Sequence, residues 1–363
     1  MVYLGDILEY EQPTKYIVSS ENYNDSYATP VLTAGQTFIL GYTNETEGIY
    51  SKPLPVIIFD DFTTAVKFVN FPFKVKSSAM KILKAANKDV HIPYWYYYLT
   101  SVHIDNDLHK RYWISTFANM QVNVPSLKVQ RQIAARLDKV QELIALQKEQ
   151  IKKTDELIKS RFIEIFGDPI ANPKGWPVKR MGELFKITSG GTPSTKEPKY
   201  WDNGTIPWIG SNLCQNSILD VNDGNFITEI GLKNSSAKIL PTGTILIALV
   251  GATIGKTALL NFTTTTNQNI SAIWVSENEL YNSYFVFYFV QGLYDLFMRI
   301  GNGKFKMANL KFINNLPMFD IPLLLQNKFA DFVAGAEKQK TLLNNRLSML
   351  ETLYKSLMQE YFG

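Results

Sequence analysis

Apolar residues recur at alternating spacings of four and three along two long stretches of the chain. Residues 127–166 contain no glycine or proline, and in the stretch that follows Pro322 only Gly335 interrupts, at about 1 kcal/mol relative to alanine. A 4-3 repeat kept for more than four heptads turns one seam of a helix toward a partner. Both stretches are therefore predicted to be helices of about forty residues, each roughly 60 Å long. The predicted seam positions are Ile133, Leu137, Val140, Ile144, Gln147, Ile151, Thr154, Ile158, Arg161 and Ile165 in the first helix, and Phe329, Val333, Ala336, Lys340, Leu343, Leu347, Leu350, Tyr354, Leu357 and Tyr361 in the second.

The two helical stretches are copies of one unit. Residues 159–167 recur as residues 355–363 with five of nine positions identical, at an offset of 196. The same offset pairs Gln130 with Gln326. The chain therefore contains a duplicated segment of about forty residues.

The two seams differ in a complementary way. Polar Gln147, Thr154 and Arg161 in the first helix correspond to leucines in the second. Lys340 in the second helix corresponds to Ile144 in the first. Helices with unlike seams prefer each other over self-pairing, so we expect an antiparallel coiled coil within the chain. The alternative is that each helix packs independently on its own domain.

Short runs rich in β-branched and aromatic residues fill the rest of the chain, bounded by turn residues as strands require. These runs lie at residues 56–59, 65–71, 244–250 and 270–275. The predicted fold class is α+β, with two globular β-rich domains separated by two long helices. The predicted divisions are residues 1–125, 126–170, 171–321 and 322–363.

Composition narrows the class of protein further. With 363 residues, of which 45% are apolar, the chain suits two or three folded domains. Its single cysteine, Cys214, excludes a disulfide framework, and its three histidines lack metal-binding spacing, so we expect no metal. No signal peptide or membrane span is evident, which favours a cytoplasmic protein without membrane partners. A net charge of +4 permits nucleic-acid binding without requiring it.

Four motifs suggest catalysis but depart from the required pattern. Residues 251–257 have three residues between their glycines where a phosphate-binding loop needs four, and residues 257–262 suggest a strand after a hairpin turn that presents Lys256. Residues 70–73 (Asn-Phe-Pro-Phe) differ from the methyltransferase tetrapeptide at the second position. Asp168 with residues 197–199 only weakly matches a nuclease motif, and Cys214 has no histidine in its own globule. We therefore predict no catalytic residues and no cofactor.

The layout resembles the DNA-specificity subunit of type I restriction–modification enzymes. The repeated helices, with Pro125 and Gln130 in one copy, Pro322 and Gln326 in the other, and Phe-Gly at both ends, are similar to its central repeats. Segments of both globules are similar to its target-recognition domains. In the second globule these are residues 188–194, 200–201, 206–209, 243–248, 251–256 and 267–269, and in the first globule they are residues 58–62 and 71–73. The resemblance implies a non-catalytic subunit that reads a bipartite, asymmetric site on double-stranded DNA. It also implies two methyltransferase subunits and ATP-dependent restriction subunits as partners.

Candidate DNA contacts follow from the chemistry of readout. Asn, Gln, Lys and Arg can bind base edges, whereas Ser, Thr, Lys and backbone amides suit phosphates. In the second globule the candidates are Ser189, Gly191, Thr192, Lys196, Asn212, Lys256, Thr257, Asn267, Gln268, Asn302, Lys304 and Lys306. In the first globule they are Lys15, Thr63, Thr64, Lys67, Lys110 and Arg111.

Charge and composition leave two other classes of protein open. The first globule has ten basic against twelve acidic residues, so a DNA-binding face on it must be local. One alternative is a coiled-coil scaffold that links two protein-interaction domains. The other is a free-standing DNA methyltransferase or nucleotide hydrolase.

Overall fold

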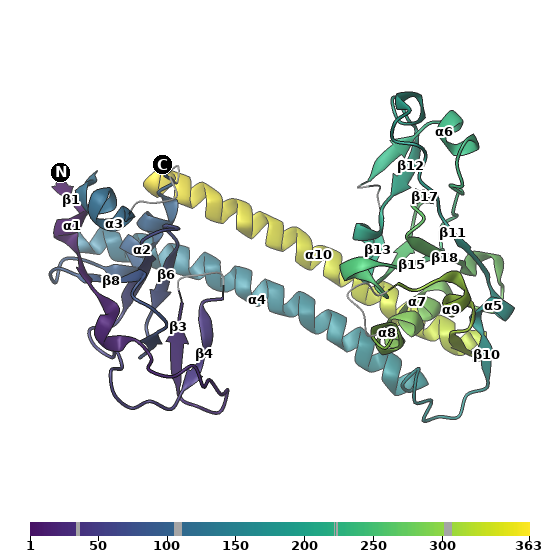
Figure 1. Cartoon of the computed structure of the whole chain (residues 1–363), viewed down its shortest axis with the longest axis horizontal. Coiled ribbons are helices and arrows are strands. Elements are labelled where there is room, and N and C mark those ends of the chain that lie inside the picture. The colour runs from purple at the N-terminus through teal and green to yellow at the C-terminus, as the bar shows by residue number, and fades with distance from the viewer. Residues whose placement is uncertain (34–36, 105–110, 221, 223, 301–306) are drawn as a thin grey trace. The chain divides into compact units, whose positions relative to one another are not determined.

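The computed structural model describes residues 1–33, 37–104, 111–220, 222, 224–300 and 307–363. The chain divides into two compact units, Met1–Lys148 with Asn345–Gly363, and Glu149–Asn344. Each unit contains one globule and a part of each long helix (Figure 1). The helices are α4 (Leu127–Phe166) and α10 (Leu323–Phe362), each of forty residues, which confirms the predicted helices.

The globule of the first unit contains two main sheets and a short strand pair. The four-stranded sheet has the order β2 (Leu8–Glu11), β8 (Met80–Ala85), β5 (Val56–Asp60) and β6 (Val66–Val69). The three-stranded sheet has the order β4 (Ile39–Thr43), β3 (Thr29–Leu32) and β7 (Lys74–Val75), and the pair is β1 (Val2–Tyr3) with β9 (Gln121–Val122). Helices α1 (Leu4–Ile7), α2 (Ile92–Ser101) and α3 (Tyr112–Ser115) complete this globule.

The globule of the second unit repeats this strand order. Its larger sheet is β11 (Lys186–Ser189), β18 (Ile270–Trp274), β15 (Ile245–Ala248), β16 (Thr257–Leu260) and β13 (Ser217–Leu219). Its smaller sheet is β14 (Asn225–Ile227), β12 (Ile206–Ile209) and β17 (Thr265–Thr266), and its pair is β10 (Val178–Arg180) with β19 (Pro317–Phe319). The helices are α5 (Met181–Leu184), α6 (Glu229–Lys233), α7 (Ser283–Gly292), α8 (Tyr294–Met298) and α9 (Leu310–Asn314). Apart from β13, each strand has a counterpart with the same neighbours, so the duplication extends over the globules.

The two helices run antiparallel within each unit, because two contacts along them are reversed in order. The first unit has a hydrogen bond from Arg136 to Tyr361 (3.0 Å) and the second has a ring contact of Phe162 with Phe329 (5.4 Å), each in addition to an ion pair. In the first unit, Lys148 forms an ion pair with Glu351 (3.0 Å). In the second unit, Lys340 forms one with Asp155 (2.8 Å). Burial alone would lower the pKa of Lys340, but its hydrogen bonds to Asp155 and Glu337 raise that pKa overall. The polar seam residue Lys340 is therefore held as a charged partner of the facing helix.

One end of the predicted seam is wrong. Arg161 is exposed and forms an ion pair with Glu164 (2.7 Å), whereas Phe162 and Phe166 enter the core. The reason is that the globule packs on this part of α4 together with α10: the ring of Phe166 has Phe285 of the globule at a centroid distance of 4.8 Å and Phe329 of α10 at 5.5 Å. At this end of α4, the residues that face the core are therefore not the ones that the heptad pattern predicts.

The repeated glutamines fix the start of each helix in the same way. Gln130 Oε1 accepts from the His91 amide (2.9 Å), and Gln130 Nε2 donates to the carbonyl oxygens of Asp89 (3.0 Å) and Pro125 (2.9 Å). Both glutamines are fully buried. Each therefore joins its helix to the loop that leads into α2 or α7. The partners of Gln326 are the Asn282 amide (2.9 Å) and the carbonyl oxygens of Leu280 (3.1 Å) and Ile321 (2.7 Å).

Within the described part of the chain, no helix is long and apolar enough to cross a membrane.

Candidate nucleic-acid interface

In the second unit, the loop after β11 lies against the turn between β17 and β18. The Gly191 amide donates to the Thr266 carbonyl oxygen (2.7 Å), and a Cβ on Gly190 would lie 2.2 Å from that oxygen. Only glycine permits this approach. The exposed Thr192 hydroxyl then donates to Gln268 Oε1 (2.6 Å). The structure thus brings the candidates Gly191, Thr192 and Gln268 together.

Two asparagines extend this cluster. A Cβ on Gly210, at the end of β12, would lie 2.6 Å from Asn212 Oδ1 and 3.7 Å from Asn267 Nδ2. Asn267 Oδ1 also accepts from the Asn269 amide (3.0 Å), which fixes the turn before β18. The exposed Asn212 and half-buried Asn267 therefore border the same glycine. We call Thr192, Asn212, Asn267 and Gln268 the amide cluster.

Of three other candidates in the second unit, one is buried and two are half-buried. Thr257 is fully buried in β16, and its hydroxyl contacts Asn216 Oδ1 (3.3 Å), so it supports the fold and offers no surface to DNA. Ser189 is half-buried in β11 opposite Ser271. Lys256 is half-buried, follows the turn between β15 and β16 as predicted, and donates to Gln215 Oε1 (2.8 Å).

Lys196 is exposed in the loop that leads into the Pro198–Tyr200 turn. Asn302, Lys304 and Lys306 lie outside the described residues, as does Lys110 of the first globule.

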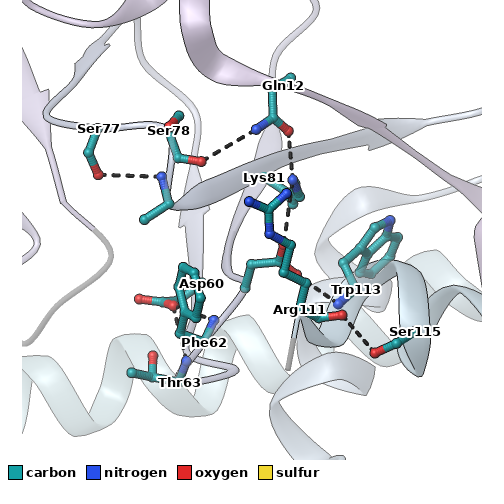
Figure 2. Close-up of polar contacts among 12 residues, drawn as sticks. Gln12, Asp60, Phe62, Thr63, Ser77, Ser78, Lys81, Arg111, Trp113 and Ser115 are labelled. Carbon is teal, nitrogen blue, oxygen red and sulfur yellow. Dashed lines mark hydrogen bonds and ion pairs between the residues drawn. The ribbon is translucent and has the colours of Figure 1, made fainter. Parts of the chain in front are cut away.

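In the first unit, the turn between β5 and β6 presents Thr63 and Thr64. Asp60 Oδ1 accepts from the amides of Phe62 (2.8 Å) and Thr63 (3.0 Å), as Figure 2 shows. Thr64 has a φ of +58°, and its amide donates to the Asp60 carbonyl oxygen (3.0 Å). The turn leaves Phe62 and Thr63 exposed. Exposed Arg111 directly precedes α3, whose Tyr112 amide donates to the Asp61 carbonyl oxygen (3.0 Å).

A buried ion pair lies beneath this turn. Asp61 and Lys81 are 2% and 3% exposed, and Lys81 Nζ lies 3.4 Å from Asp61 Oδ2. Asp61 Oδ1 also accepts from the Trp113 amide (2.8 Å) at the start of α3 (Figure 2). Each member satisfies the other's charge, so the pair connects the turn, β8 and α3. Sequence reasoning missed it, although a lysine inside the apolar run of β8 signals a buried partner.

The other two candidates of the first globule already have partners. Lys15 is exposed and forms an ion pair with Glu11 (2.7 Å), whose hydrogen bond raises the pKa of Lys15. Lys67 is half-buried in β6, with its Nζ 5.9 Å from the ring centre of Phe38.

The residues that suggested catalysis have structural roles. Asp168 Oδ1 accepts from the amides of Ile170 (2.8 Å) and Ala171 (2.7 Å) just after α4. Burial raises the pKa of the Cys214 thiol to about 12, which keeps it protonated and a poor nucleophile. Among the described residues, no group of three or more His, Cys, Asp or Glu side chains could hold a metal ion.

Comparison with known proteins identifies the family. Residues 1–155 and 173–352 match the family model described as type I restriction modification DNA specificity domain. The chain therefore belongs to this family and is a specificity subunit rather than an enzyme. This result decides against a free-standing methyltransferase or nucleotide hydrolase.

Individual relatives support the assignment. The specificity subunit of the type I restriction enzyme EcoR124I/EcoR124II from Escherichia coli is 41% identical over 295 residues, covering 76% of this chain and 71% of that one. The MjaIX specificity subunit from Methanocaldococcus jannaschii is 39% identical over 103 residues, or 28% of this chain and 23% of that protein. The solved S subunit of the type I system of M. genitalium shares the fold at 16% identity, with a TM-score of 0.64 and coverage of 99% of this chain and 95% of that one.

Proposed function

We propose that the chain reads a bipartite, asymmetric DNA site, with one half-site bound by each globule. The observation that carries the proposal is the repeated topology: apart from β13, the two globules have the same strand order, and a polar turn precedes both β8 and β18. The loops differ in sequence between the globules, so the two half-sites differ as well. In the second globule, the amide cluster supplies the paired donors and acceptors that base readout needs.

The two helices act in this proposal as a spacer. They form an antiparallel coiled coil between residues 126–170 and 322–363 and separate the recognition domains, residues 1–125 and 171–321. The ion pairs from Lys148 to Glu351 and from Asp155 to Lys340 support antiparallel pairing in each unit. The gap between the half-sites is then fixed by helix length.

The partners follow from the family. In a cytoplasmic complex, the subunit would position two methyltransferase subunits and ATP-dependent restriction subunits on the recognised site. Phosphate contacts are assigned to exposed Lys196, Thr63 and Arg111, together with the candidates outside the described residues. Thr257 is left out because it is buried.

A domain exchange tests this function. Residues 1–125 are replaced by the corresponding globule of another family member, the variant is co-expressed with its methyltransferase partner, and methylated sites are mapped across the host genome. We expect one half-site to change while the other half-site and the gap stay the same, because each globule has its own core. A change in both half-sites would contradict independent recognition. Homogeneous chain without partners serves as the control and should neither methylate nor cleave DNA.

A further inference from the structure

The strand registers align the two globules residue by residue. Strand β8 lies between β2 and β5, and β18 lies between β11 and β15. The last pair of β5 with β8 is Asp60 opposite Met80, and the last pair of β15 with β18 is Ala248 opposite Ile270. Met80 and Ile270 are therefore counterparts, each at the first position of its strand.

The same alignment relates the turns that precede these strands. Ser77 Oγ accepts from the backbone amide two residues further on (3.4 Å), and Asn267 Oδ1 accepts from the amide two residues further on (3.0 Å). Both residues lie three positions before the counterparts at the strand starts. Ser77 is therefore the counterpart of Asn267. Ser78, the next residue, is the counterpart of Gln268 in the amide cluster.

Gln12 completes the correspondence on the neighbouring strand. Glu11 lies opposite Ile82 in the pairing of β2 with β8, which places Gln12 next to Lys81. Gln12 is thus the counterpart of Ser189, which lies directly before the loop of the amide cluster. Gln12 Nε2 donates to the Ser78 carbonyl oxygen (3.4 Å). In both globules, a hydrogen bond therefore joins the residues that follow the outer strand (β2 or β11) to the turn that precedes its neighbour (β8 or β18).

Lys81 determines which way the Gln12 amide points. An ammonium group can only donate hydrogen bonds, so the amide atom that faces Lys81 Nζ at 2.6 Å is Oε1. Nε2 then points toward Ser78, as Figure 2 shows. Its bond to Ser78 uses one of the two Nε2 hydrogens, and the other has no partner among the described residues. Gln12, Ser77 and Ser78 are all exposed. The loop therefore presents one amide donor and two hydroxyl groups to a ligand.

We propose that Gln12, Ser77 and Ser78 are specificity-determining residues of the first globule, and that Lys81 is the positioning residue that fixes the Gln12 amide. The inference rests on the proposed function of the globules as DNA readers. A fixed amide donor in the major groove binds an acceptor such as a purine N7, guanine O6 or thymine O4. Gln12 thus selects a base that carries an acceptor at one position of the first half-site.

The test uses the full chain co-expressed with its methyltransferase partner, with methylated sites mapped genome-wide. We expect Gln12→Ala, and separately Ser77→Ala with Ser78→Ala, to relax base preference within one half-site by about tenfold or more. The other half-site and the gap should stay unchanged. The matched control is Asn87→Ala. Asn87 is exposed just beyond the other end of β8, and its Oδ1 accepts from the Asp89 amide (2.9 Å) in a similar turn. We expect this variant to leave the specificity unchanged.

Two variants of the buried pair test the positioning role. Lys81→Arg keeps a cationic donor facing Gln12 and should keep the base preference. Lys81→Met with Asp61→Asn removes both charges together while Asn Oδ1 can still accept from Trp113. We expect this variant to fold, as judged by its melting curve, and to relax the same base position as Gln12→Ala. Retention of full base preference in the folded double variant would overturn the positioning role.

Gln268→Ala in the second globule separates failure of this inference from failure of the proposed function. If it alters one half-site while the Gln12, Ser77 and Ser78 variants alter nothing, the inference is wrong and the function stands. If none of these variants and no domain exchange alters the methylated sequence, the proposed function itself is wrong.

Discussion

Gln130 and Gln326 have fully buried side chains, and each makes three hydrogen bonds to backbone groups. Gln326→Ala leaves a donor and two acceptors in the protein interior without partners. We expect a loss of about 2–4 kcal/mol in the free energy of unfolding, measured by urea denaturation of the full chain. Exposed Gln339→Ala in the same helix should change it by less than about 0.5 kcal/mol. Similar losses for both variants would contradict the structural role of Gln326.

Glu45 links the stability of the first unit to pH. Its carboxylate forms an ion pair with buried Lys74 (2.8 Å) and accepts from the amides of Ser19 (2.9 Å) and Ser20 (3.1 Å). Burial alone would raise the pKa of Glu45, but these partners lower it from 4.5 to about 2.

A carboxyl group with a lowered pKa stabilises the fold above its unfolded value, and this contribution disappears as the pH falls. We therefore expect Glu45 to contribute fully above pH 4.5 and to lose its contribution between pH 4.5 and about 2. Melting temperatures of wild type and Glu45→Gln measured across this range should converge at the acid end. A constant difference between them would contradict the assignment.

Some residue-level features are visible in the sequence and others are not. The repeat singled out Gln130 and Gln326, because identical residues at one offset need no structure to be found. The sequence predicts Thr257 as a DNA contact, yet it lies in β16, a strand whose four residues are all buried. The pair of Asp61 with Lys81 stayed hidden because it depends on the register of β5 with β8, which residue spacing does not give.

At the scale of elements, Gly335 lies where a side chain would have space, whereas Gly167 lies where one would not. Gly335 is in the middle of α10, and a Cβ there would meet nothing within 4 Å. Gly167 follows the end of α4 with a φ of +82°, and its Cβ would lie 2.9 Å from Pro173 Cγ. The first glycine therefore weakens its helix, whereas the second terminates one.

Gly335→Ala should accordingly stabilise the protein by up to about 1 kcal/mol, because alanine restricts the unfolded chain and suits a helix. Gly167→Ala is the contrasting variant and should destabilise it, because alanine tolerates neither the positive φ nor the contact with Pro173. Thermal unfolding of the full chain measures both effects. A destabilising Gly335→Ala would contradict the open space that the structure gives this glycine.

The two long helices could be predicted because a sustained 4-3 pattern specifies their type and approximate extent, although the division predicted at residue 170 lies four residues beyond the end of α4. The shared topology of the globules could not. Their turn residues differ, as with Ser77 and Ser78 in the place of Asn267 and Gln268, and only the backbone pairing relates them. The seam error at Arg161 has a similar cause, since the globule adds Phe285 to Phe329 of α10 in covering Phe162 and Phe166 on that turn of α4.

At the scale of the whole molecule, the proposed spacer predicts that the length of the two helices sets the gap between the half-sites. One heptad inserted after Ile151 in α4, and one after Leu347 in α10, keeps the seam register of both helices. Along each helix, the insertion point lies between the two residues that form the ion pairs of Lys148 with Glu351 and of Asp155 with Lys340. Insertion of a heptad in one helix alone mismatches the pair and serves as the control for disrupted pairing.

Seven residues lengthen each helix by about 10 Å, which corresponds to roughly three base pairs along B-DNA. Tilt of the helices against the DNA axis, and rotation of one globule around the duplex, reduce that increase. We expect the doubly lengthened variant, co-expressed with its methyltransferase partner, to methylate sites with a longer gap and unchanged half-sites, because no base-reading loop has moved. Genome-wide mapping of methylated sites measures the gap directly. An active variant that keeps the original gap would show that the helices do not set the spacing, and the coiled-coil spacer would have to be abandoned while recognition by the two globules could still stand.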